Sequence, residues 1–208
     1  MLISCYDYNL INVTSTVKRF SDEYKLKGNK RSHVESIRLP FSNASKIIKA
    51  YVQDEGHVKE DLIAVNTTPE SIFNERVYKL LQEDLPDYRF VNFHEHEFNS
   101  AEYYRLLSKA KILISFNETD ANPYNVYEAM LMGCCPILPN IEIYKKMFNE
   151  NWLYNKKILK PPMLNYLRMG QEIHEKIRLI ENNSLYYNME EDIKRIDEQY
   201  FNSEDLKN

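Results

Sequence analysis

Residues 110–140 read AKILISFNETDANPYNVYEAMLMGCCPILPN and contain the most informative pattern of the chain. The pattern begins with the apolar run Ile112-Leu113-Ile114, which is typical of a strand covered on both faces. A polar loop follows, and then a segment that we expect to be helical, with Val126, Met130 and Tyr127 toward the sheet. A second strand resumes at residues 136–139. This order predicts a β-α-β unit whose loop lies at the carboxyl end of a parallel strand, where open α/β sheets bind ligands.

The predicted helix has recognisable signals at both ends. Asn122 is of a residue type favoured at the N-cap, and Pro123 would then take the first helical position, where its missing N–H costs nothing. Gly133 is expected to end the helix in a left-handed conformation. The helix start would attract a phosphate or a sugar oxygen, because free N–H groups and the helix dipole point there. Those N–H groups would belong to Tyr124, Asn125 and Val126.

Two acids, Asp120 and Glu128, flank this helix start with seven residues between them. Glu128 lies about one and a half turns into the helix, and its side chain is long enough to reach back toward the loop. A carboxylate accepts two hydroxyl donors at once, which suits the vicinal hydroxyls of a ribose. Asp120 could hold a hydroxyl of a transferred sugar. The residues alone leave open an ordinary strand-loop-helix unit in which both acids are solvated.

The acids and the residues that follow resemble a motif of retaining glycosyltransferases with the GT-B fold. In that family a Glu-x7-Glu motif ends in Glu-Ala-Met or a close variant, followed by a Gly and a Pro-Val or Pro-Ile strand. Here the corresponding residues are Asp120, 128–130, Gly133 and 136–137. The resemblance implies that Glu128 holds the ribose of the donor and Asp120 contacts its sugar. It also implies retaining transfer from a nucleotide diphosphate sugar, with no metal and no cofactor.

The resemblance covers roughly residues 55–200 of the chain. A helix with the pattern Tyr-x-x-Leu-x-x-Ala leads into the motif strand, as it does in the family. The fold class that follows is α/β, a Rossmann-like parallel sheet flanked by helices, forming one lobe of a GT-B enzyme. Further strands are expected at 61–67 and 89–93, and helices at 70–83, 100–110, 141–148, 163–181 and 184–200.

The amino end resembles the last part of the family's acceptor lobe. A strand is expected at 7–15, a helix at 16–24 and a second strand at 34–40. The resemblance thus divides the chain into 1–50, a remnant of the acceptor lobe with the interlobe linker, and 51–208, the donor lobe. A two-lobe enzyme needs about twice this length. We therefore expect a second polypeptide, or a homo-oligomer, to supply the acceptor lobe.

The sequence departs from the family where the donor diphosphate would lie. The family has a Gly-Arg turn and a nearby Lys after its opening strand, whereas this chain has Asn66-Thr67-Thr68-Pro69 and no cation before Arg76. Neutralising a leaving diphosphate is a large part of such catalysis. We expect Thr67 and Arg76 to contact the donor, with Arg76 or another lobe supplying the charge. Asp120, in place of the first Glu, is also shorter by one methylene.

The segment His94-Glu95-His96-Glu97 contains ligand-type residues but lacks the i, i+4 spacing of a helical zinc site. Polar decoration of a loop is the plainer interpretation. Because His94 follows a predicted strand, it is nevertheless a candidate for contact with the donor base or sugar. No metal site is predicted.

Composition is that of a soluble domain. The chain has 208 residues, 43% of them hydrophobic, which suffices for one main domain with a real core. A net charge of −4 argues against autonomous nucleic-acid binding. We expect no membrane span and no signal peptide. The three cysteines, with Cys134 and Cys135 adjacent, form no disulfide framework, so we expect a cytoplasmic protein, in the host cytoplasm if a phage encodes it.

Three interpretations are open at this stage. The first is a glycosyltransferase donor lobe, and the abundance of Asn, Lys, Ile and Tyr suggests an AT-rich source such as a phage or a low-GC bacterium. Its acceptor would then be a modified base in phage DNA or a polysaccharide. The second is an inactive module that binds a nucleotide sugar or a partner, which the missing Arg-Lys pair favours. The third is an unrelated response-regulator-like or flavodoxin-like domain in which Asp120 and Glu128 are incidental.

Overall fold

The computed structural model describes residues 8–11, 33–36, 58–67, 72–118, 123–155, 163–182 and 189–198. The chain divides into two compact units, residues 1–43 with 196–208, and residues 44–195. Two parallel strands are described in the first unit, β1 (Tyr8–Ile11) and β2 (His33–Ser36), close to the two strands that the sequence predicts there. The helix expected at 16–24 lies outside the described residues. The assignment of this region to an acceptor lobe stays a prediction.

The second unit is built on a five-stranded parallel sheet in the order β4-β3-β5-β6-β7. The direction of strand addition reverses between β3 and β5, and doubly wound sheets bind ligands beyond the carboxyl ends of the strands at such a point. The predicted α/β, Rossmann-like class is therefore confirmed. The strands are β3 (Glu60–Asn66), β4 (Arg89–Asn92), β5 (Ala110–Ser115), β6 (Cys135–Pro139) and β7 (Leu153–Tyr154).

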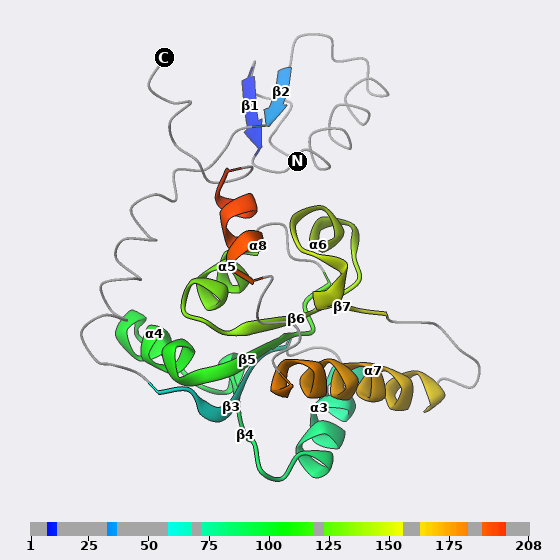
Figure 1. Ribbon diagram of the computed structural model, residues 1–208. Coiled ribbons are helices and arrows are strands. Elements are labelled where there is room, and N and C mark those ends of the chain that lie inside the picture. The colour runs from blue at the N-terminus through cyan, green and yellow to red at the C-terminus, as the bar shows by residue number, and fades with distance from the viewer. Residues whose placement is uncertain are drawn as a thin grey trace. The chain divides into compact units, whose positions relative to one another are not determined.

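Helices cover both faces of this sheet (Figure 1). In the view shown, α3 and α7 lie together below the sheet, and α5 and α6 lie above it. Two short 3-10 turns, η2 (Phe93–Glu95) and η3 (Glu150–Trp152), follow β4 and precede β7. The helices are α3 (Ile72–Asp84), α4 (Ser100–Lys109), α5 (Tyr124–Leu131), α6 (Glu142–Met147), α7 (Met163–Glu181) and α8 (Met189–Ile196).

The core lies on the two central strands. Residues 62–65 of β3 and 112–114 of β5 have no solvent exposure, as expected for strands covered on both faces. On α5, Val126, Tyr127 and Met130 are buried against the sheet, which confirms the predicted apolar face. The edge strand β7 was not predicted from the sequence, because two residues are too few to show a periodic pattern.

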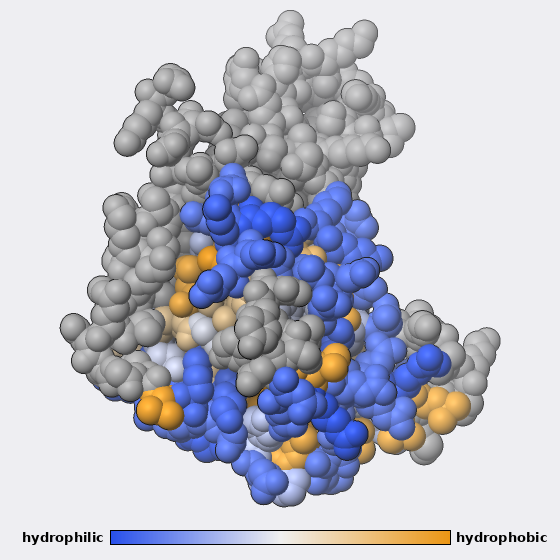
Figure 2. Space-filling view, in the orientation of Figure 1, coloured by the Kyte–Doolittle hydropathy of each residue, from blue (hydrophilic) through white to orange (hydrophobic). Residues whose placement is uncertain are grey.

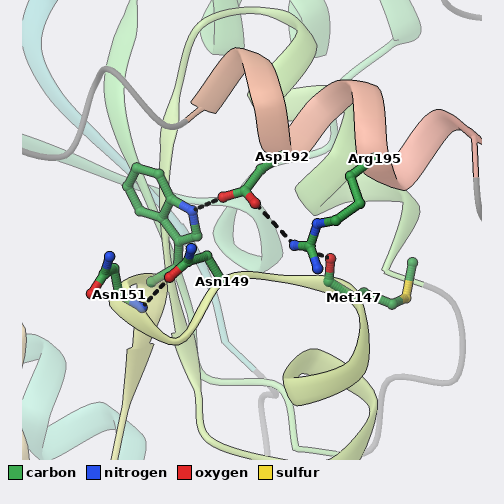
Figure 3. Close-up of polar contacts among 6 residues, drawn as sticks. Met147, Asn149, Asn151, Asp192 and Arg195 are labelled. Atoms are coloured by element: carbon green, nitrogen blue, oxygen red, sulfur yellow. Dashed lines mark hydrogen bonds and ion pairs between the residues drawn. The ribbon is translucent and has the colours of Figure 1, made fainter.

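The helix α8 is fixed by a buried carboxylate (Figure 3). Asp192 is 5% exposed and accepts hydrogen bonds from Trp152 Nε1 at 2.7 Å and from the Arg195 guanidinium at 2.9 Å. The guanidinium also donates to the Met147 carbonyl at 3.1 Å. A buried charge is tolerated only when it is paired in this way. The network therefore orients α8 against α6 and η3.

The described surface is mainly hydrophilic on the face shown in Figure 2, with separate hydrophobic patches between the polar regions. The exposed large apolar side chains are Val58 and three leucines of α7, Leu164, Leu167 and Leu179. Among the described helices, none combines the length and the apolar character needed to cross a membrane.

Candidate functional site

Buried polar side chains collect where three neighbouring strands of the sheet end. Asn66 ends β3, Asn92 ends β4 and Ser115 ends β5, and each is less than a tenth exposed. Thr67, which follows β3, is also buried, and its hydroxyl donates to Asn92 Oδ1 at 3.2 Å. Buried polar groups are costly unless they are hydrogen-bonded. Their concentration at the carboxyl edge of the sheet marks this edge as the candidate site.

The segment between β4 and α4 is shaped by two caps at this edge. Asn92 Oδ1 accepts from the His94 N–H at 3.2 Å and thereby caps η2. Asn99 Oδ1 accepts from the Glu102 N–H, and the Glu102 carboxylate accepts from the Asn99 N–H, each at 3.0 Å. This capping box fixes where α4 begins. As a result, Tyr103 is held near the start of the helix.

A cavity of about 330 Å³ lies between this segment and α4. Its volume is within the range of small-molecule sites, about 300–1,000 Å³. The ring of Phe93 lies 5.3 Å from that of Tyr103, and the ring of His96 lies 5.5 Å from that of Phe98, centroid to centroid. Such a wall offers aromatic faces to a flat ligand. The cavity is lined by Phe93, His96, Phe98, Ser100, Tyr103 and Tyr104.

Two of these wall residues hold the acid that the sequence singles out on α5. The Tyr103 hydroxyl donates to Glu128 Oε2 at 3.1 Å, and the Tyr104 hydroxyl donates to Glu128 Oε1 at 3.0 Å. Burial raises the pKa of Glu128 above its ordinary value, while the hydrogen bonds from Tyr104 and Tyr103 act in the opposite direction. Burial and the neighbouring carboxylate raise the pKa of Tyr103, so this phenol stays protonated and donates. Glu128 is thus hydrogen-bonded to two residues that line the cavity.

The start of α5 differs by one residue from the prediction. Pro123 occupies the N-cap position and not the first helical position, because its ψ of 52° is not helical and its carbonyl accepts from the Tyr127 N–H at 3.2 Å. Asn122 lies outside the described residues. The Val126 N–H donates to Asn125 Oδ1 at 2.9 Å. This N–H is therefore already hydrogen-bonded, whereas the sequence predicts a free N–H group there.

The structure brings only some of the predicted site residues together. Thr67 lies at the same edge of the sheet as the end of β4, and Glu128 lies behind the cavity wall. Arg76 and His94 are exposed, and neither is among the described residues that line the cavity, whereas His96 is. Asp120 lies outside the described residues. The roles predicted for all of these residues, Glu128 and Thr67 included, stay predictions.

The tyrosine pair and the buried amides were not predicted to belong to the site. The adjacent tyrosines at positions 103 and 104 could have pointed to it, because a tyrosine hydroxyl needs a hydrogen-bond partner when it is buried. In the sequence they form part of a helical pattern. Asn66 and Asn92 are the last residues but one of the predicted strands 61–67 and 89–93, and they could have been identified in the same way as Thr67. Among the described residues, no group of three His, Cys, Asp or Glu side chains is placed to hold a metal ion.

The two helices that carry Tyr103, Tyr104 and Glu128 are also joined at their other ends. Lys59 Nζ donates to the carbonyls of Leu107 at 3.2 Å and Ala110 at 2.7 Å, where α4 ends, and to that of Met132 at 2.7 Å, just after α5. The carboxyl-terminal ends of helices carry partial negative charge, which suits a partly buried ammonium. Burial lowers the pKa of Lys59, and nearby Cys134 acts in the opposite direction. We refer to these three bonds as the Lys59 clamp.

Gly133 and Cys134 complete the surroundings of this clamp. Gly133 has a φ of +77°, as the sequence predicts, and a Cβ added there would lie 3.3 Å from Lys59 Cε. The Cys134 thiol donates to the Ala110 carbonyl at 3.0 Å, and burial raises its pKa to about 11. The thiol is therefore held in the protonated form, which is that of a packed cysteine and not of a nucleophile.

Comparison with known proteins identifies the fold but no family. No family model and no curated protein matches the chain. The structure of the pneumococcal O-GlcNAc transferase GtfA in complex with UDP and GlcNAc matches 94% of this chain and 42% of that chain, with a TM-score of 0.62 and 9% identity. A structure of the GtfA/B complex matches 93% of this chain and 46% of that chain, with a TM-score of 0.45 and 8% identity.

At this level of identity the likeness to GtfA concerns the fold alone. The chain has the α/β fold found in part of a glycosyltransferase. It spans less than half the length of either matched chain.

Proposed function

We propose that the chain is the donor-binding lobe of a retaining glycosyltransferase with the GT-B fold. One observation carries the proposal: an aromatic cavity at the carboxyl edge of the sheet shares two wall residues, Tyr103 and Tyr104, with the hydrogen-bonded surroundings of Glu128. The motif that contains Glu128 and the likeness to a glycosyltransferase solved with UDP and GlcNAc support the same conclusion.

The nucleoside part of the donor would use the cavity and the acid behind it. A nucleobase is flat and polarisable, and aromatic faces such as those of Phe93 and His96 stack on bases with little dependence on base identity. The ribose hydroxyls would donate to Glu128. Burial favours this, because hydrogen bonds to a carboxylate are stronger where water is excluded.

The diphosphate and the sugar would extend from there toward the start of α5. The N–H groups at Tyr124 and Asn125, together with the helix dipole, would stabilise the charge that develops when the bond between the sugar and the diphosphate breaks. Asp120 would hold a hydroxyl of the sugar, and Thr67 would contact the donor from the end of β3. Arg76 or a cation of another chain would neutralise the diphosphate. No metal or cofactor is needed in this scheme.

A second polypeptide, or another copy of this chain, would supply the acceptor lobe. A modified base in phage DNA and a polysaccharide are the acceptors that the sequence suggests.

The test is calorimetric titration of the purified chain with UDP, UDP-GlcNAc, GDP and ADP. Glu128→Ala should abolish nucleotide binding, because it removes the only acceptor proposed for the ribose hydroxyls. Glu83→Ala, which removes an exposed acid of α3, is the matched control and should bind like the wild type. A folded Glu128→Ala variant with unchanged affinity would contradict the ribose assignment.

A binding module without turnover is the second candidate. The described residues of the cavity wall include no lysine or arginine, and the segment from Asn66 to Pro69 contains none either. A site without a cation binds a neutral nucleoside more readily than it stabilises a leaving diphosphate. Binding of UDP-GlcNAc without any release of UDP, in the presence of candidate acceptor-lobe partners, would favour this module over the enzyme.

A further inference from the structure

We infer that Tyr103 and Tyr104 are positioning residues that fix the plane of the Glu128 carboxylate and thereby make the site selective for ribonucleotides over deoxyribonucleotides. The inference deepens the proposed function and rests on it. Two phenols each use part of the hydrogen-bond capacity of the Glu128 carboxylate and leave the rest for a ligand.

The two phenols bond to different oxygens of the same carboxylate. Tyr103 donates to Oε2 and Tyr104 donates to Oε1. The last torsion of a glutamate side chain is broad and roughly two-fold, so a single donor would leave the carboxylate free to rotate. One donor on each oxygen removes that rotation. The plane of the Glu128 carboxylate is thus set by α4 and not by α5, on which the residue lies.

The pair also leaves acceptor capacity for a ligand. An ionised carboxylate has about four acceptor positions, two on each oxygen. The two phenols occupy one position on each oxygen, so one remains on each. Two adjacent hydroxyls of a cis-diol can fill the remaining positions together, whereas a 2′-deoxyribose fills only one.

The phenols themselves are held in place by their neighbours. The rings of Tyr103 and Tyr104 lie 5.3 Å apart, and Phe93 packs on Tyr103 at the same centroid distance. The capping box at Asn99 fixes the start of α4, and the Lys59 clamp ties the far end of that helix to α5. The donors are therefore positioned before a ligand arrives, which avoids an ordering cost on binding.

The competing explanation is that the two phenols only satisfy the hydrogen bonds of a half-buried carboxylate and play no part in ligand selectivity. In that case their removal would loosen the packing between α4 and α5 and would affect all ligands alike. The two explanations differ in the ratio of two affinities and not in the size of either one, so a comparison of matched ligands separates them.

The experiment titrates UDP and 2′-deoxy-UDP into the wild-type chain, Tyr103→Phe, Tyr104→Phe and the double variant. Phenylalanine keeps each ring and removes only the hydroxyl. The matched control is Tyr88→Phe, which removes another tyrosine-to-glutamate hydrogen bond, that of Tyr88 with Glu181, away from the cavity wall. Thermal unfolding of each variant reports its stability separately.

We expect the wild type and the control to prefer UDP by about tenfold or more, the effect of one unpaired acceptor. In the double variant the affinity for UDP should fall about tenfold, while that for 2′-deoxy-UDP should change by less than about threefold. The single variants should lie between, and they decide the matter if the double variant does not fold.

An equal fall in both affinities, or no change in either, would overturn the positioning role while leaving Glu128 as a nucleotide contact. A wild-type chain that binds neither nucleotide would overturn the proposed function and this inference together. The two failures are therefore distinguishable.

Discussion

The same two helices, α4 and α5, are joined at both of their ends, and the two junctions are built in opposite ways. At the carboxyl edge of the sheet, Tyr103 and Tyr104 donate to Glu128 beside a cavity. At the amino edge, the Lys59 ammonium donates to three main-chain carbonyls. An ammonium has three donors, so the clamp uses its whole capacity, whereas the carboxylate of Glu128 has capacity to spare.

This difference separates a structural junction from one suited to a ligand. Both junctions contain a partly buried ionisable group with close partners. Burial lowers the pKa of Lys59 and raises that of Glu128, and each shift favours the neutral form, so the pKa shifts do not distinguish the junctions. What distinguishes them is the unused hydrogen-bond capacity and the adjacent cavity. Three substitutions test whether the two junctions differ in this way.

Lys59→Met should have the largest effect, and it should act on stability. The three carbonyls at the helix ends would lose a charged donor in a site from which water is largely excluded, which we expect to lower the free energy of unfolding by about 3 kcal/mol. Denaturant titration measures this loss. The control is Lys79→Met, because its ion pair with Glu75 is exposed and should contribute little to stability. Similar losses for both variants would show that the clamp is no stronger than a surface pair.

Gly133→Ala should have an intermediate effect. A β-carbon is strained at a φ of +77°, and it would lie 3.3 Å from Lys59 Cε, so the lysine side chain would have to shift slightly. We expect a loss of about 1–2 kcal/mol, again from denaturant titration. In the Lys59→Met background the loss should be smaller if part of it comes from the clamp. A loss independent of the residue at position 59 would assign all of it to the backbone.

Glu128→Gln should have the smallest effect on stability and should be recognised by its pH dependence. Because burial raises the pKa of Glu128 in the folded state, the protonated form favours folding, and this contribution is lost as pH rises through the folded pKa. The wild type should therefore lose stability relative to Glu128→Gln as pH increases from the ordinary value of 4.5 upward. Parallel stability curves over that range would contradict the raised pKa.

Local features of this fold could be predicted from the sequence, and contacts between distant segments could not. The apolar strand at 112–114, the buried face of α5 and the left-handed Gly133 follow from residue type and spacing within one segment. The bonds between α4 and Glu128 join residues 24 and 25 positions apart, and their geometry depends on how two helices pack on the sheet. Residue types alone do not specify that packing.

The amino-edge junction was beyond prediction for the same reason. Lys59 bonds to carbonyls that lie 48 to 73 positions further along the chain. In the sequence it is one lysine among many, next to an acidic residue that opens β3. The N-cap of α5 differs from the prediction on a smaller scale, because the proline ring fixes φ but leaves ψ open.

The Lys59 clamp also has a consequence for the order in which the chain assembles. Because Lys59 precedes Met132 by 73 residues, the third bond of the clamp can form only after Met132 has been synthesised. Contacts over such separations form late, since the intervening loop must first be closed. We therefore expect the Lys59 clamp to form after the folding transition state. Its loss should then speed unfolding more than it slows folding.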